Sequence, residues 1–529
     1  MTLRRGLLAA VALSAIGVGG VGTADAKTLR WASFGDANSL DPHVLNETFT
    51  IGFHGNIYEG LIRRDENLEI QPALARDWEL VEPTRWRFYL REGVTFHNGN
   101  AFNADDVIFT FERILMDGSD MGGKFPSGTE VLRVDDYTVD FITSDPNPIL
   151  HAEFADIFIM DKEWAEEHDA IEPSDVATGR ESYAAFNANG TGAFRVESRE
   201  TGVRTELVPN GEWWDEPEHN LSRVIFTPIS SGSTRVAALL SGEIDMMYPV
   251  PVQDLNRVES NPGTSTMTGP ELRTIFLGMD QMRDELLYSN IEGENPLQDR
   301  RVREAFYRAI DVDAIQQRIM RGQADPSALM LAPILFERAD NFERLEHDPD
   351  KARKLLAEAG YPEGFEIGMD CPNDRYVNDE SICQAVVSML ARIGVDVDLN
   401  AQTRAEYFAK VLGYDTSFYL LGWTPSSLDS LNVLRNLINC LDRDATPVRA
   451  QFNYGGYCNE RVDALTERIA VETDETLRDD MIEEAFALLH EDRGYIPLHQ
   501  QYLAWGKKDS VDLVQRPDNQ FMMFRVRMD

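Results

Sequence analysis

The chain has 529 residues, 43% of them hydrophobic, which is enough to bury a large core and predicts two or three domains. Its 90 acidic residues outnumber 50 basic ones and give a formal net charge of −40 at pH 7. A negative field of this size repels nucleic acids and anionic membrane surfaces, so nucleic acid is excluded as a partner. The charge says little about the fold.

The first 26 residues have the pattern of a cleavable signal peptide. Arg4 and Arg5 form a basic start, and Leu7–Val21 forms an apolar stretch. Residues 24–26, Ala-Asp-Ala, supply the small residues of a cleavage site. The apolar stretch is shorter than the ~20 residues that a membrane-spanning helix needs, which disfavours an anchor. We expect cleavage after Ala26 and a periplasmic protein, exported by the Sec route or, given the paired arginines, by the twin-arginine route.

Alternating strands and helices are expected after the signal peptide. Period-two and short apolar runs predict strands, whereas apolar residues three and four positions apart predict helices. This alternation indicates an α/β fold with a partly parallel sheet. In chain order, we expect a strand at 28–33, a helix at 48–60, strands at 86–90, 131–143 and 223–229, a helix at 233–240, strands at 244–247 and 271–280, helices at 296–320 and 350–359, a strand at 365–371, a helix at 379–393, strands at 395–399 and 417–423, one or two helices at 460–490, and a strand at 496–505.

Four cysteines, all in the C-terminal half, predict two disulfides in an exported protein. Three connectivities are possible. Pairing Cys371 with Cys383 and Cys440 with Cys458 closes the shortest loops and is the connectivity we expect. A metal site built from all four thiolates is the alternative, but no C-x2-C pair is present, so we predict no metal.

The stretch Trp86–Ile114 carries the clearest local pattern. Trp86, Phe88 and Leu90 alternate with polar residues, which predicts a half-buried strand. Asn103 is a good helix N-cap, and two acidic residues follow it in the first turn, where the helix dipole favours them. We therefore expect a strand, a turn, a second strand at Val94–Phe96 and a capped helix.

The same stretch, which begins WRFYLREGVTFHNGNAFNADDV, closely resembles the signature of the extracellular solute-binding proteins of family five, the peptide/nickel type that serves ABC importers. Other segments resemble the same family along nearly all of the chain after the signal peptide. They are found at Asn56–Leu61, Pro72–Trp78, Asn189–Phe194, Ser241–Asp245 and Val302–Asp311.

The resemblance implies a two-lobed periplasmic binding protein of the large type (type II), an α/β fold with an additional domain and two crossover strands between its lobes. Lobe I is then expected to comprise residues 27–71, 207–280 and 502–529. The additional domain, which includes the signature, covers residues 72–206, and lobe II covers residues 281–501.

By the same resemblance, the protein captures a small solute between its lobes and presents it to the permease of an ABC transporter in the inner membrane. A short peptide is the favoured ligand, the protein is expected to be a monomer, and no cofactor is expected. Another solute in the same fold, such as an opine, an oligosaccharide or a nickel chelate, stays open, as does a chemoreceptor-like or chaperone-like partner role.

A secreted hydrolase is the alternative of another class. However, the sequence has neither a G-x-S-x-G nor an H-E-x-x-H motif. The G-x4-G-K string at Gly118–Lys124 lacks the Ser or Thr that binds magnesium in a P-loop, and a predicted helix rather than a strand precedes it. We expect a surface loop there.

Gly422 and Trp423 end a predicted strand and lead into a polar turn. An aromatic face and hydrogen-bonding groups at the carboxyl edge of a sheet are typical of an α/β ligand cleft. In family five, the matching Gly-Trp stretch lines the ligand cavity, and peptide binders carry an Asp shortly after it that pairs with the peptide amine. Here Ser426 stands at that position and Asp429 is the candidate substitute. Core packing of Trp423 is the alternative.

Arg375 lies in a predicted strand-to-helix loop with Asn373 and Tyr376. Its guanidinium offers a planar fork for a ligand carboxylate, the role that the resemblance to dipeptide binders implies for an arginine in this segment. A solvated arginine or a salt bridge is the alternative.

Four further residues complete the candidate ligand site. Met247 and Tyr248 follow a predicted strand and are expected to supply a wall from the other lobe, with core packing as the alternative. His499 and Gln501 lie on the predicted return strand.

Overall fold

The computed structural model describes residues 27–529 except 38, 176–177 and 446–447. The predicted signal peptide and its cleavage site lie outside the described residues. None of the helices that the structure describes is both long and apolar enough to cross a bilayer.

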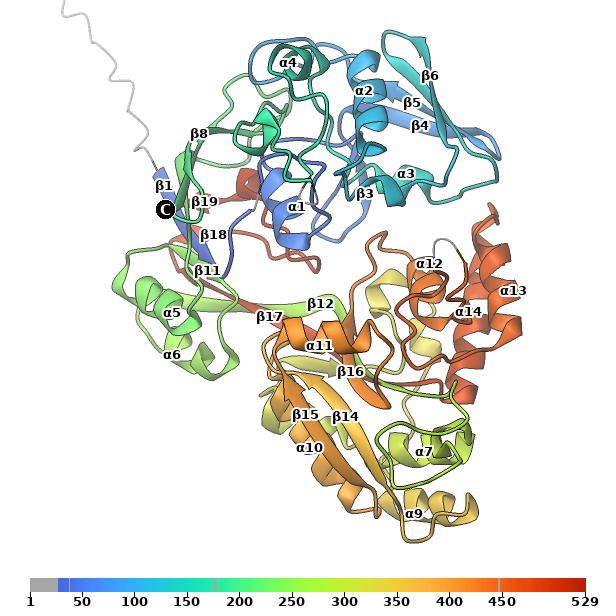
Figure 1. Ribbon diagram of the computed structural model, residues 1–529. Helices are drawn as coiled ribbons and strands as arrows, with labels where there is room; N and C mark the ends of the chain where they lie inside the picture. The colour runs from blue at the N-terminus through green and yellow to red at the C-terminus, as the bar shows by residue number, and fades with distance from the viewer. Residues whose placement is uncertain (1–26, 38, 176–177, 446–447) are drawn as a thin grey trace, which may run out of the picture.

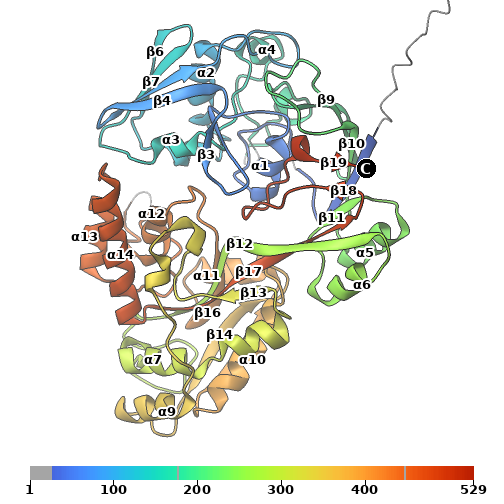
Figure 2. The ribbon, with the colours of Figure 1, turned by 180° about the vertical axis from the view of Figure 1, so that it is seen from behind.

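Two long antiparallel strands, β12 and β17, connect the halves of the molecule (Figures 1 and 2). The strands of lobe I lie on one side of this pair and those of lobe II on the other, so the predicted crossover strands are present. The sheet has 11 strands, in the order β15 (Asp396–Gln402), β14 (Glu366–Pro372), β16 (Phe418–Trp423), β12 (Thr264–Met279), β17 (Tyr495–Lys508), β11 (Met246–Tyr248), β1 (Lys27–Ser33), β10 (Leu221–Pro228), β9 (Arg204–Pro209) and β8 (Phe194–Glu200), with β13 (Ala324–Pro326) pairing with β17 off this path. The lobe I side also includes β8 and the start of β9, which fall within the range expected for the additional domain.

Each lobe contains parallel strands joined through helices. In lobe I, β1 pairs parallel with β10 and β11, and in lobe II, β14 pairs parallel with β15 and β16. Parallel neighbours need a crossover connection, which is usually a helix. Here α5 (Gly232–Ser241) connects β10 to β11, α10 (Asp379–Ala391) connects β14 to β15, and α11 (Arg404–Val411) connects β15 to β16. The other helices of the lobes are α1 (Thr48–His54), α6 (Leu255–Glu259), α7 (Arg300–Ala309), α8 (Val312–Ala314), α9 (Pro349–Glu358), α12 (Ser430–Val433), α13 (Glu460–Ile469) and α14 (Glu475–Asp492).

A second, antiparallel sheet stands in the predicted additional domain, with strand order β4-β5-β7-β6. Its Phe88 and Phe141 belong to the same buried cluster as Trp31 and Phe226 of lobe I. Because one core serves both, lobe I and this sheet form a single packed unit. The elements of this domain are β4 (Ala75–Glu82), β5 (Arg85–Leu90), β6 (Glu130–Asp135), β7 (Thr138–Ile142), α2 (Ala104–Ile114), α3 (Leu150–Glu153) and α4 (Lys162–Glu167). Lobe I also contains two small two-stranded sheets. One consists of β2 (Ile62–Arg64) and β3 (Ile70–Pro72), and the other of β18 (Val511–Asp512) and β19 (Arg527–Met528).

The predicted first strand and capped helix of the signature stretch are confirmed, but the second strand expected at Val94–Phe96 is wrong, because only an isolated bridge forms there, between Thr95 and Ala101. Trp86, Phe88 and Leu90 point into the core from β5. Asn103 caps α2, accepting a hydrogen bond from the first turn while the Asp106 carboxylate accepts one from the Asn103 backbone. This reciprocal capping satisfies backbone donors that the helix itself leaves free.

Both predicted disulfides are present. Cys371 in β14 pairs with Cys383 in α10, and Cys440 pairs with Cys458. This pairing contradicts the alternative metal site, because all four sulfur atoms are bonded to one another in pairs. The first disulfide fixes the strand and helix on either side of the loop that carries Arg375.

A buried ion pair joins the first loop of lobe I to α2. The guanidinium of Arg113 donates to both carboxylate oxygens of Asp41, at 2.8 and 2.6 Å, and neither side chain has solvent-exposed surface. Burial alone would raise the pKa of the Asp41 carboxyl, but the charge and hydrogen bonds of Arg113, together with those of His43, outweigh it and lower that pKa. A remaining guanidinium nitrogen donates to the Ala170 carbonyl oxygen.

Replacing Asp41 with Asn should destabilise the protein strongly, because it leaves the Arg113 charge buried without its counter-ion. We expect the free energy of unfolding to fall by about 3–5 kcal/mol, measured by chemical denaturation. Asp350→Asn is the matched control, because Asp350 pairs with Arg353 on the surface and its side chain is 82% exposed. The control should change the free energy by less than about 0.5 kcal/mol. Equal effects of the two substitutions would contradict this role for Asp41.

Candidate functional site

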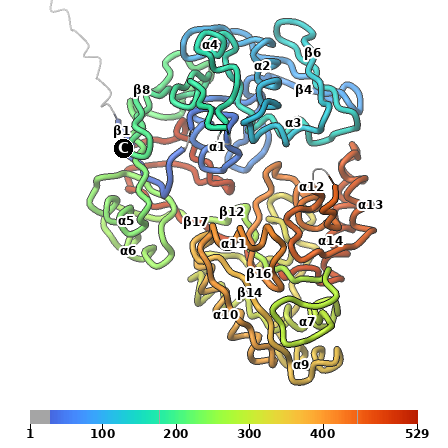
Figure 3. The backbone as a smooth tube through the Cα atoms, viewed as in Figure 1, coloured from blue at the N-terminus to red at the C-terminus, as the bar shows by residue number. Residues whose placement is uncertain are grey.

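A cleft with a volume of about 1020 Å³ lies between the additional domain and lobe II. In the backbone trace of Figure 3, the part of the chain that carries α3 lies opposite the part that carries α12 and α14. Ligand pockets usually measure roughly 300–1,000 Å³, so this cleft has room for a short peptide or a solute of similar size. One wall contains Asp120, Lys124, Asp145, Asn147 and Glu153, and the other contains Ser426, Ser427, Asn432, Arg435, Gln451 and Glu467.

Strand β16 ends beside this cleft, and its last residues are packed tightly. A Cβ atom on Gly422 would lie 2.7 Å from both the Tyr376 ring and the Ile275 side chain, so only glycine fits. Trp423 is half-buried, donates from Nε1 to Asn432 at 2.9 Å, and its ring centroid lies 4.9 Å from that of Phe452. The predicted aromatic group is therefore held in one orientation next to the cleft wall.

The loop between β14 and α10 presents Arg375 and Tyr376 to the same place. One carboxylate oxygen of Asp379 accepts the backbone N–H groups of both residues, at 2.9 Å each, which fixes the loop. The Tyr376 hydroxyl donates to the Gly422 carbonyl oxygen at 3.3 Å, and the Arg375 guanidinium lies 5.2 Å from the centre of the Tyr376 ring. Asn373, two residues before Arg375, is exposed.

The Arg375 guanidinium has no carboxylate or hydrogen-bonding partner among the described residues. Although Arg375 keeps exposed surface, burial of its charged group lowers its pKa, and the nearby positive charge of Arg273 lowers it further. A guanidinium that is partly desolvated and unpaired can accept a ligand anion with little rearrangement.

Sequence reasoning missed Arg273, which β12 places at this site. Its guanidinium lies 5.8 Å from the centre of the Tyr376 ring, and its Nε lies 3.2 Å from a carboxylate oxygen of Glu271. The signal was present in the sequence, because Glu271 and Arg273 are the charged residues of an otherwise apolar strand end, ELRTIFLGM. Burying a charged side chain is costly unless it has an ionic or hydrogen-bonding partner, so charges on an apolar strand indicate such partners.

Gln501 is brought into the site, as a buried connector rather than a cleft-lining residue. Its side-chain amide donates to Glu271 at 2.6 Å and its side-chain oxygen accepts the Val377 backbone N–H at 2.9 Å. It thereby ties β12 and β17 to the loop that carries Arg375.

The structure gives Ser426 and Asp429 different environments. Ser426 is exposed in the cleft wall and accepts a hydrogen bond from Asn432 at 3.0 Å. Both carboxylate oxygens of Asp429 accept from Arg478, at 2.6 and 3.0 Å, and one also caps α12 at Leu431. The geometry thus corrects the expectation of a free Asp429 carboxylate for a ligand amine.

Three other candidates lie in the core rather than at the cleft. Met247 and Tyr248 are buried in lobe I, where the Tyr248 ring stacks on Trp505 at 4.9 Å. His499 has no exposed surface, and burial lowers its pKa to about 3, so the imidazole is neutral. These three positions are corrected to structural roles, because their strands turn these side chains toward packed neighbours.

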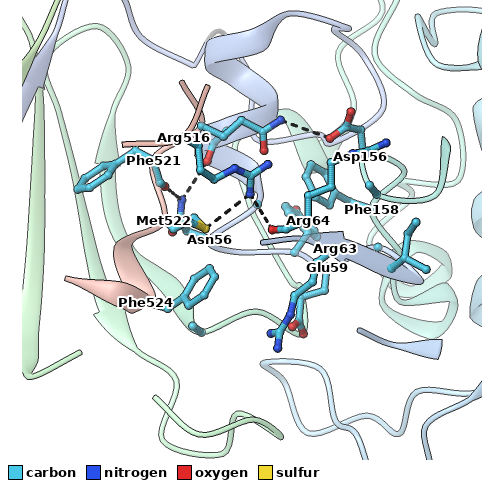
Figure 4. Close-up of a pocket in the computed structure, with 18 of the residues that line it drawn as sticks. Asn56, Glu59, Arg63, Arg64, Asp156, Phe158, Arg516, Phe521, Met522 and Phe524 are labelled. Atoms are coloured by element: carbon cyan, nitrogen blue, oxygen red, sulfur yellow. Dashed lines mark hydrogen bonds between the residues drawn. The ribbon is translucent and has the colours of Figure 1, made fainter. Parts of the chain in front are cut away.

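A second, smaller cavity of about 60 Å³ lies between lobe I and the additional domain, which contributes Asp156 and Phe158 to its lining (Figure 4). Arg516 donates to the Arg64 carbonyl oxygen at 3.0 Å, and Asn56 donates to the Phe521 carbonyl oxygen at 2.8 Å. The space suits a few water molecules and is too small for a peptide. Its hydrogen bonds hold the C-terminal segment against lobe I.

The family model of the bacterial extracellular solute-binding proteins, family 5 Middle, matches residues 69–444. The chain belongs to this family. Its members are solute-binding proteins, and the matched range includes the signature stretch, Arg375 and the Gly422–Trp423 strand end.

Relatives of family 5 match almost the whole chain. The dipeptide-binding protein of Escherichia coli strain K12 is 25% identical over 521 residues, covering 93% of this chain and 92% of that protein. Heme-binding protein A of Haemophilus influenzae is 24% identical, covering 84% and 81%. The solved structure of the periplasmic binding protein DppA from Helicobacter pylori, in complex with the peptide STSA, has a TM-score of 0.74 and 23% identity and covers 95% of this chain and 98% of that one. The predicted two-lobed fold is confirmed.

The pairing of Asp429 with Arg478 can be measured by a double-mutant cycle. We expect Asp429→Asn and Arg478→Gln each to lower the free energy of unfolding, because each leaves a half-buried charge without its partner. The double variant should lose less than the sum of the two, giving a coupling energy of about 1–3 kcal/mol in denaturation experiments. A coupling energy below about 0.5 kcal/mol would contradict the ion pair and restore Asp429 as a free carboxylate.

Proposed function

We propose that this chain is the exported, periplasmic solute-binding component of an ABC importer, and that it captures a short peptide between its lobes and delivers it to the membrane permease. The observation that carries the proposal is the Arg375 guanidinium, which has no ion pair among the described residues. It lies over Tyr376, whose hydroxyl contacts Gly422 in the strand that leads to the cleft wall at Ser426. The protein would act as a monomer, without cofactor and without catalysis.

The arrangement of the lobes supports capture by closure. Lobe I and the additional domain share a core, and β12 and β17 are the long strands that join them to lobe II. Bending of two strands costs little compared with disrupting a core, so hinge closure around a ligand is the expected motion. A closed cleft excludes bulk solvent and strengthens polar contacts to the ligand.

The polar groups support a peptide with a free C-terminus. The Arg375 guanidinium would receive the terminal carboxylate, and Trp423 would pack against a ligand side chain. Ser426 and the exposed Asn373 would supply hydrogen bonds, directly or through water. Water trapped in a cleft of this size lets side chains vary while the peptide ends are held.

One observation favours a second candidate, a non-peptide solute in the same cleft. Asp429, the carboxylate expected to pair with a peptide amine, is already held by Arg478. One relative of this chain is a heme-binding protein, so family membership alone does not set the ligand. An anionic solute without an amine would fit the same guanidinium.

Native mass spectrometry of protein purified without denaturation decides between these candidates. A mass excess that resolves into a series of short peptides would support peptide capture. A single non-peptide mass would support the second candidate. Protein unfolded and refolded without ligand serves as the reference for the unliganded mass.

Arg375→Gln tests the carboxylate contact. We expect peptide affinity to fall about 10- to 100-fold in calorimetric titration, because a charge-assisted hydrogen-bond pair contributes roughly 1.5–3 kcal/mol. Arg443→Gln is the matched control, since Arg443 also lies over a tyrosine ring of lobe II, 4.6 Å from the centre of Tyr414. Arg443 belongs to another segment, the loop closed by the Cys440–Cys458 disulfide, so affinity should stay within about threefold of the original. Similar losses in both variants would overturn the assignment of Arg375.

A further inference from the structure

Two guanidinium groups share one aromatic platform in the ligand region. Arg273 and Arg375 lie 5.8 and 5.2 Å from the centre of the Tyr376 ring. They come from different elements, β12 and the loop between β14 and α10, so the fold rather than sequence proximity brings them together. Their like charges repel each other, and the carboxylate of Glu271 beside Arg273 offsets part of that repulsion.

The platform itself is fixed. The Tyr376 hydroxyl is bonded to the Gly422 carbonyl oxygen, and a Cβ on Gly422 would meet the ring at 2.7 Å and the Arg273 Cδ at 3.2 Å. The absence of a side chain at Gly422 thus allows the tyrosine and the arginine stem to pack against one strand end. A site held this way loses little entropy when it binds a ligand.

The carboxylates around this platform are already engaged. Glu271 lies near Arg273 only through Nε, and its two oxygens also accept hydrogen bonds from Gln501 and Asn519. Asp379 is occupied by the backbone N–H groups of Arg375 and Tyr376. Among the described residues, no carboxylate forms an ion pair with the Arg375 guanidinium, whereas Arg273 is paired with Glu271.

A third arginine, Arg435, lies on the lobe II wall of the cleft. It has no ion pair among the described residues, and Asp429 is held by Arg478. The same wall also carries the exposed carboxylate of Glu467, so its charge is mixed. Arginines attract the anionic groups of a ligand at short range.

We infer that the preferred ligand carries two carboxylates close together, and that Arg273 receives the second of them. Within the proposed function, on which this inference rests, the ligand is a short peptide that ends in Glu or Asp. Arg375 takes the terminal carboxylate and Arg273 takes the acidic side chain. Arg273 is then a specificity-determining residue for this solute class.

Two peptides that differ only in charge test the inference. Ala-Ala-Glu and Ala-Ala-Gln have the same shape, and calorimetric titration of the unaltered protein with each gives their affinity ratio. We expect Ala-Ala-Glu to bind at least about tenfold more tightly, and Arg273→Gln to reduce that ratio to near one while changing Ala-Ala-Gln affinity by less than about threefold. Arg443→Gln should keep the full ratio.

The outcomes separate the two proposals. Equal affinities for the two peptides in the unaltered protein overturn the role of Arg273 and leave peptide capture standing, whatever the variants do. Binding of neither peptide, with a non-peptide mass in native mass spectrometry, overturns both. If Arg273→Gln fails to fold, Arg273→Lys replaces it, and it should retain a preference for Ala-Ala-Glu that is smaller than the original, because ammonium keeps the charge without the planar fork. An unchanged preference in a folded Arg273→Gln variant also overturns the inference.

Discussion

The pairing of β12 with β17 is the constraint on which the rest of the molecule depends. The register runs regularly to Pro270 opposite Tyr502 and resumes at Thr274 opposite Gln500. Three residues of β12, from Glu271 to Arg273, therefore stand opposite Gln501 alone. Such a bulge bends a strand, increases its twist and re-aims the side chains it carries. The bend lies where the two lobes meet, so the irregularity that shapes the hinge also places charged groups at the site.

The bulge divides its side chains between the lobes. Glu271 is directed to Asn519 in the C-terminal segment of lobe I, and Arg273 is directed to Tyr376 in lobe II. Burial raises the pKa of the Glu271 carboxyl, and the charge of Arg273 and the hydrogen bond from Gln501 oppose that rise. A buried carboxylate is costly unless its partners are in place, so this network penalises any other register of the two strands. Apolar residues at these positions would carry no such cost in another register, so they would fix the register of the two strands less specifically.

Local features of the fold could be predicted from the sequence, and long-range placement could not. The alternation of Trp86, Phe88 and Leu90 and the cap at Asn103 depend on neighbours within a few residues, and both predictions are confirmed. Gly422 and Tyr376 were also singled out, because turns at the carboxyl ends of strands converge in α/β folds.

The site residues that sequence reasoning misjudged are those decided by distant partners. Asp429 is held by Arg478, 49 positions away, which no local pattern reports. Tyr248 is buried because Trp505 lies on the neighbouring strand, and that order is a property of the whole sheet. Arg273 is missed for a different reason. The apolar residues around it are explained by a strand, and a strand pattern gives no information on which side chains lie across the lobe boundary.

The net charge of the protein limits what the site can do at a distance. An anionic ligand approaching a chain of net charge −40 meets overall repulsion, but at physiological ionic strength this field is screened over about 8 Å. The Arg273 and Arg375 guanidiniums therefore act on a ligand only once it is inside the cleft, where water is scarce and charges interact more strongly. Selection of an anion then depends on short-range geometry at the Tyr376 platform rather than on electrostatic steering. A strongly acidic surface and two arginines at the binding site are compatible in one molecule for this reason.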